Sequence, residues 1–167
     1  MRVFYGLIIT AVILMIGACA LKAYKKEGAL ARVVFLYELG AFICGIIFLV
    51  YTYVPGTTIT VLCKGLIMAS FDWLLILLMY YTQYYTGMFK GIVGVKVFMI
   101  AYSLLETVAF LINTWTRWIF DITYISDDQI IVQFAKGNVL GRLHYVFAYG
   151  IMSVSYTHLT LPTNSRV

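Results

Sequence analysis

The stretch ITVLCKGLIMASFDWLLILLMYY, Ile59 to Tyr81, decides the class of fold because it is apolar almost throughout and contains no proline. A helix crosses the hydrocarbon core of a bilayer with about 20 apolar residues, and this stretch supplies that length. Its interior nevertheless holds Lys64 and Asp72. A charge in hydrocarbon costs at least about 2.5–3.5 kcal/mol and therefore turns toward the interior of a helix bundle. The stretch predicts a membrane helix with one side facing other helices.

Three further apolar runs of similar length occur along the chain, at residues 3–21, 33–54 and 92–112. The composition agrees with four spans, because 63% of the 167 residues are hydrophobic and only 11% are charged. Soluble proteins carry about a quarter charged residues. We therefore expect an all-α polytopic membrane protein whose main partner is the lipid bilayer. A shorter apolar run at 143–153 predicts a fifth helix that is too short to span.

Basic residues cluster directly after the first run: Lys22, Lys25, Lys26 and Arg32. Positively charged loops stay in the cytoplasm, so this cluster places the 22–32 and 86–91 loops inside and the N-terminus outside. The run at 3–21 has an alternative interpretation, a lipoprotein signal peptide ending at Cys19. Basic residues immediately after such a peptide oppose translocation, which favours a retained helix.

The segment at about 115–140 is too polar to cross a membrane. Within it, WIFDITYI (Trp118–Ile125) and QIIVQFA (Gln129–Ala135) flank the turn-forming sequence SDD. Runs of β-branched and aromatic residues around such a turn predict a two-stranded hairpin. The predicted topology makes this hairpin extracellular. Because an isolated hairpin is only marginally stable in water, we expect it to lie on the ends of the helices.

Ionisable residues within the predicted spans are the candidate functional residues: Glu38, Lys64, Asp72, Lys96 and Glu106. Asp72 is the deepest, and Lys64 and Glu106 lie toward the outer side, where they can pair. His144, at the outer end of the fifth helix, either joins them or is an ordinary interfacial histidine. Two interpretations stay open for Lys64, Asp72, Glu106 and His144. They form a ligand, ion or proton site, or they form a polar clamp between helices.

Other signals are structural or absent. Glycines at four positions in or beside the spans predict close helix packing: Gly40, Gly45, Gly91 and Gly94. The chain has no Gly-rich phosphate loop, no Ser–His–Asp set and no His/Cys group with metal-ligand spacing. The net charge of +5 comes without a basic surface carrying interleaved aromatic residues. We therefore expect no catalytic residues, metal site, cofactor or nucleic-acid partner.

Several motifs in this order resemble a bacterial family. They are GLIITAVILMIGACALKAYKK at the start, ALARVVFLYELG before the second helix, YYTQYYTG with Tyr85-Thr86-Gly87, INTWTRWIFDI at Ile112–Ile122, and the segment Gly141–Tyr149. Together they are similar to the N-terminal seven-helix membrane region of sensor histidine kinases and diguanylate cyclases. The resemblance covers about residues 5–153.

The resemblance implies that residues 1–153 are part of a sensory input module in the bacterial inner membrane. Such a module passes an extracellular or in-membrane signal, a small molecule or a lipid, to a cytoplasmic kinase or cyclase domain, and the full-length protein forms a homodimer. Two alternatives do not depend on the resemblance. One is a small transporter or channel component with Asp72 and Glu106 in an ion or proton path, and the other is a structural membrane subunit.

The last fourteen residues, VSYTHLTLPTNSRV at 154–167, interrupt the fifth helix with a Thr-rich, Pro-containing sequence. Residues 154–163 resemble the conceptual translation of a transposase-type sequencing adapter. We therefore expect residues 154–167 to be a non-native tail that cuts the chain within its fifth helix. The alternative is a natural polar C-terminus.

Overall fold

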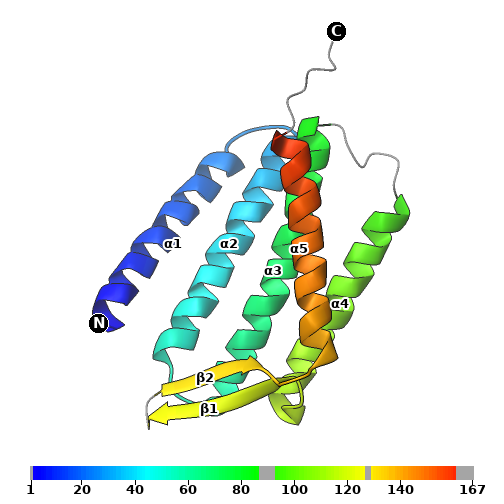
Figure 1. Ribbon diagram of the computed structural model, residues 1–167. Helices are drawn as coiled ribbons and strands as arrows, with labels where there is room; N and C mark the ends of the chain where they lie inside the picture. Colours follow the sequence, from blue (N-terminus) through cyan, green and yellow to red (C-terminus); the bar gives the residue numbers. More distant parts are fainter. Residues whose placement is uncertain (1, 87–92, 127–128, 161–167) are drawn as a thin grey trace.

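The computed structural model describes residues 2–86, 93–126 and 129–160. These residues form five helices and two strands: α1 (Arg2–Tyr24), α2 (Ala29–Tyr53), α3 (Thr57–Thr86), α4 (Val93–Thr116), β1 (Phe120–Ser126), β2 (Gln129–Phe134) and α5 (Val139–Thr160). The helices run side by side, and the two strands cross the bundle at the end where the N-terminus lies (Figure 1). Four of the helices, α1 to α4, are long and apolar enough to cross a membrane.

Each of the four predicted spans overlaps one of the helices α1 to α4, but the ends differ. α2 begins four residues earlier than predicted, at Ala29, α4 ends four residues later, at Thr116, and α3 ends five residues later. The predicted helix ended at Tyr81, whereas α3 continues through the more polar sequence TQYYT to Thr86. The hydroxyls of Thr82 and Thr86 donate to the carbonyls of Leu78 and Thr82, at 2.9 and 2.7 Å. These bonds satisfy the hydroxyls within the helix itself, so the polar residues do not end it.

The fifth helix also extends beyond its predicted limits of 143–153. It begins at Val139 and continues through Thr160, into the segment expected to be a tail. Residues 154–160 contain neither glycine nor proline, while Pro162 follows soon after the helix ends. Proline disfavours helical geometry at the residue before it. The non-native origin of residues 154–167 stays a prediction, and residues 161–167 lie outside the described part of the chain.

The outer helices expose large apolar side chains. Among the residues of α2, all of which the structure describes, none is buried. Its exposed side chains include Leu36, Ile43, Ile46 and Phe48. Extended apolar surfaces of this kind are unfavourable in water but suit contact with lipid. The surface of the bundle thus agrees with the composition in indicating a membrane protein.

The predicted hairpin is present and packs on the helix ends as expected. β1 and β2 pair antiparallel, with Phe120 opposite Phe134 and Ile122 opposite Val132. Phe120 and Val132 are buried and join a core cluster that includes Phe110 of α4. One face of the hairpin therefore completes the hydrophobic core at this end of the bundle. The turn at 127–128 lies outside the described residues.

Glycines do bring helices together, but the set differs from the prediction. A Cβ at Gly40 would lie 3.1 Å from a side-chain atom of Leu74, and one at Gly45 would lie 2.7 Å from Ile13. Both positions confirm close packing. Gly94 was predicted wrongly, since no neighbouring helix in the described part of the chain comes within 4 Å of its Cβ position, and Gly91 lies outside the described residues. The closest backbone approach is at Gly65, which was not predicted.

Candidate functional site

Two carboxylates lie within the packed faces of neighbouring helices. From Ala69 onward, the buried residues of α3 recur about every three or four positions and include Asp72 and Ile76. On α4 the buried residues recur in the same way and include Ser103 and Glu106. Residues at such spacing share one face of a helix. Because α3 packs against α4, the two acidic side chains face the bundle interior rather than lipid.

The third member of the site is His144, from the first turns of α5. Its Nδ1 lies 3.1 Å from Oε2 of Glu106 and 3.4 Å from Oδ1 of Asp72. The three residues are almost completely shielded, with exposed fractions of 0% for Asp72, 1% for Glu106 and 3% for His144. The structure therefore places His144 inside the polar cluster and not at an interface. We call Asp72, Glu106 and His144 the buried triad.

Further hydrogen bonds hold the triad's surroundings in place. The hydroxyl of Tyr102 donates to Oε1 of Glu106 at 2.8 Å. Next to Asp72 on α3, the indole N–H of Trp73 donates to the Thr107 hydroxyl on α4 at 3.2 Å. Thr107 in turn donates to the carbonyl of Ser103 at 2.7 Å. These contacts fix the rotamer of Glu106 and join α3 to α4 beside the two carboxylates.

Aromatic rings close the site on the side of the hairpin. The imidazole of His144 lies edge-on to Phe110, with 5.7 Å between ring centroids, and 6.0 Å from the ring of Phe134. A further ring contact joins α5 to α4: the centroid of the Phe147 ring, one turn after His144, lies 4.3 Å from that of Tyr102. An apolar wall of this kind excludes water and strengthens every electrostatic contact inside it.

Of the four residues expected to form the site, Asp72, Glu106 and His144 meet in the triad, whereas Lys64 makes no ion pair with them. Lys64 is half-buried on α3 and forms no ion pair with Glu106 or with any other described residue. Glu38 and Lys96 were expected to form a second pair or to reach the interface; the Lys96 amine lies over the ring of Tyr80, 5.8 Å from its centroid, and forms no ion pair with Glu38. Tyr102 was missed, although its spacing of four residues from Glu106 on one helix is a signal that the sequence offers.

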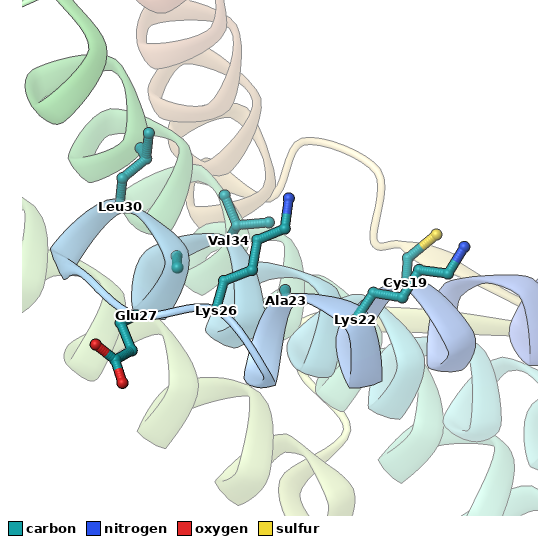
Figure 2. A pocket seen from close by; sticks show the side chains of 8 residues that line it. Cys19, Lys22, Ala23, Lys26, Glu27, Leu30 and Val34 are labelled. Atoms are coloured by element: carbon teal, nitrogen blue, oxygen red, sulfur yellow. The ribbon is translucent and has the colours of Figure 1, made fainter.

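A second feature is a hollow between α1 and α2, at the end of the bundle away from the hairpin. It has a volume of about 460 Å³ and is lined by Cys19, Lys22, Ala23, Lys26, Glu27, Leu30, Ala31 and Val34. Figure 2 shows the Lys26 amine reaching across it while the Glu27 carboxylate points away. Both lysines are exposed. Exposed basic residues at a helix end are typical of a cytoplasmic flank, and they do not define a ligand site.

No protein family model matches the chain, and no curated protein or solved structure matches it either.

Proposed function

We propose that the chain is the membrane-embedded input module of a bacterial signal-transduction protein. In this proposal it lies in the inner membrane with its N-terminus and hairpin outside. It passes a small-molecule or lipid signal to a cytoplasmic histidine kinase or diguanylate cyclase domain of a homodimeric full-length protein. The order of motifs from residue 5 to residue 153 supports it, as do the four apolar helices.

The observation that carries the proposal is the buried triad, because it joins α3, α4 and α5 through polar contacts in an apolar surrounding. Burying two carboxylates and an imidazole costs free energy that a purely apolar helix contact does not, so such a cluster indicates a functional site. A triad whose contacts change with an external signal gives two arrangements of α5 relative to α3 and α4. A ligand that binds one arrangement better shifts the population toward it.

The first test is the reading frame of an intact genomic copy. We expect the frame to continue beyond residue 153 through an uninterrupted fifth helix, further spans and a kinase or cyclase domain. A natural stop codon near residue 167, with no output domain, would contradict the proposal.

The second test is Asp72→Asn in that full-length protein, measured by output-domain activity at equal membrane level. We expect altered basal or stimulated output. Glu38→Gln is the matched control, because Glu38 is also a carboxylate in a predicted span but lies on α2. Unchanged output in Asp72→Asn would leave the triad as a structural clamp.

One observation favours a second function, a proton or cation pathway through Asp72 and Glu106. Both carboxylate oxygens of Asp72 are buried and have no hydrogen-bond partner among the described residues. A carboxylate in this state is suited to taking up a proton or ion. Flux measurements on proteoliposomes distinguish the two functions, since a transporter moves its ion without any output domain.

A further inference from the structure

The buried triad has fewer hydrogen-bond donors than its acceptors require. The Nδ1 of His144 can donate one hydrogen bond, and its nearer acceptor is Oε2 of Glu106 at 3.1 Å. The Tyr102 hydroxyl serves the other oxygen of Glu106. Asp72 is fully buried, and neither of its oxygens has a hydrogen-bond partner in the described part of the chain.

The charges of the triad are unbalanced as well. Two carboxylates face one imidazole, which carries at most a single positive charge. Lys64, the other cation of the predicted site, forms no ion pair here. His144 contacts both carboxylates but can balance only one of them, and an uncompensated buried charge costs several kcal/mol, so the site is suited to a further positive species. A proton or a metal cation can fill this role.

The geometry points to a metal cation. One donor atom from each of Asp72, Glu106 and His144 lies within 4.8 Å of the others. Zinc bonds of about 2.0–2.2 Å in tetrahedral arrangement separate the ligand atoms by about 3.3–3.6 Å. Nδ1 of His144 lies 3.1 Å from Oε2 of Glu106 and 3.4 Å from Oδ1 of Asp72, and both separations are close to that spacing.

We propose that Asp72, Glu106 and His144 bind one divalent first-row transition-metal cation of the Zn²⁺ class. Imidazole with two carboxylates suits Zn²⁺, Mn²⁺ or Fe²⁺, whereas Mg²⁺ and Ca²⁺ prefer oxygen ligands alone. On binding, Nδ1 gives up its proton to solvent and Nε2 carries the one that remains on the ring, so the ligand is a neutral imidazole. Three protein ligands leave a position for water or a signal molecule.

The surrounding contacts fit such a site. The Tyr102 hydroxyl donates to Oε1 of Glu106, the oxygen that His144 does not contact. Metal-binding carboxylates characteristically accept a hydrogen bond of this kind, which orients them toward the cation. Because its ligands come from α3, α4 and α5, the cation would link three helices near the hairpin. The inference deepens the proposed function, since it assigns a ligand class to the same triad.

The experiment is a Zn²⁺ titration of the whole chain, purified in detergent and freed of metal with a chelator. We expect one Zn²⁺ per chain and binding of Mg²⁺ and Ca²⁺ weaker by more than about tenfold. Asp72→Asn, Glu106→Gln and His144→Gln should each weaken Zn²⁺ binding by more than about tenfold, and Tyr102→Phe by about tenfold. Glu38→Gln is the matched control and should bind as the wild type does.

A measurement on folded protein without triad substitutions covers the case in which those variants fail to fold. X-ray absorption of the Zn²⁺ complex, in a His158→Gln background that leaves His144 as the chain's single histidine, should show one imidazole, oxygen ligands and no sulfur. Absence of saturable Zn²⁺ binding overturns the proposal and makes a shared proton the occupant. Binding that survives all three triad substitutions, or a spectrum without imidazole, overturns it too. Neither measurement uses signalling, so the cation site and the proposed function fail independently.

Discussion

The Nδ1 atom of His144 lies 3.1 Å from Oε2 of Glu106, although 38 residues separate the two in the chain. This contact joins α5 to α4 at a point where both side chains are shielded from solvent. It also leaves Asp72 as the member of the triad without a hydrogen bond. Because Glu106 is hydrogen-bonded and Asp72 is not, substitutions of the two carboxylates should change the stability of the protein differently.

Replacing His144 by leucine should destabilise the bundle strongly. The change keeps an apolar volume against Phe110 but leaves two buried carboxylates without their cationic or donor partner. Removing one partner of a buried charged pair costs about 3–5 kcal/mol. We expect a loss of this size in the free energy of unfolding in mixed micelles containing a chelator. Val146→Leu, at an exposed position of the same helix, is the control and should change little. A loss below about 1 kcal/mol for His144→Leu would show that the contact is as weak as a surface pair.

The two carboxylates should respond differently to neutralisation. Glu106→Gln weakens the bonds that Glu106 makes with Tyr102 and His144, and hydrogen bonds to charged groups contribute about 1.5–3 kcal/mol. Asp72→Asn breaks no hydrogen bond and weakens only the longer, 3.4 Å contact with His144, while it removes one of two neighbouring negative charges and adds a donor near Glu106. In metal-free conditions we expect Asp72→Asn to be neutral or stabilising and Glu106→Gln to be destabilising. Unfolding of the two variants side by side checks this order, and the reverse order would contradict it.

The helices were predictable from sequence because lipid-facing helices are apolar on all sides, so length and composition locate them. The same uniformity hides which face packs inward. On α3 and α4 the inward face carries polar residues among its apolar ones, such as Asp72, Ser103 and Glu106, and this is why the triad's carboxylates could be named. The helix ends were less predictable, since threonine hydroxyls that bond within α3 allow it to continue past Tyr81.

Pairings between elements could not be predicted from composition. The sequence places Lys64 and Glu106 toward the same end of their helices, which made them look like partners. The actual partner of Glu106 depends on how α5 docks on α3 and α4. That docking depends on the hairpin, whose Phe134 lies against His144. The contribution of Gly65 was missed for a similar reason, because a glycine near one helix end looks the same whether or not another backbone approaches it.

Gly65 should be intolerant of even a methyl group. A Cβ there would lie 3.1 Å from the carbonyl oxygen and 3.2 Å from the Cβ of Phe110. Backbone atoms of α4 cannot move away without separating the two helices, so Gly65→Ala should cost about 1–3 kcal/mol. Gly94→Ala is the matched control, because no neighbouring described element approaches the Cβ position of Gly94. Alanine also favours a helix over glycine by about 1 kcal/mol. Equal unfolding free energies for the two variants would disprove a close contact at Gly65.

Asn113 should be required for the turn that leads from α4 into the hairpin. Its side-chain oxygen accepts a hydrogen bond from the N–H of Ile119 at 2.8 Å, and both residues are buried. Between them Arg117 adopts a left-handed conformation, with φ of 53°, which non-glycine residues rarely adopt without support. Asn113→Leu keeps the volume but leaves a buried N–H without its acceptor, at a cost of about 1–3 kcal/mol. Hydrogen exchange at Ile119 should accelerate in this variant, while Ile112→Leu, on the exposed face of the same helix, should leave it unchanged. Unchanged protection of the Ile119 N–H from exchange in Asn113→Leu would rule out the predicted role of Asn113. Because the hairpin lies against His144, Asn113→Leu should also weaken Zn²⁺ binding at the triad.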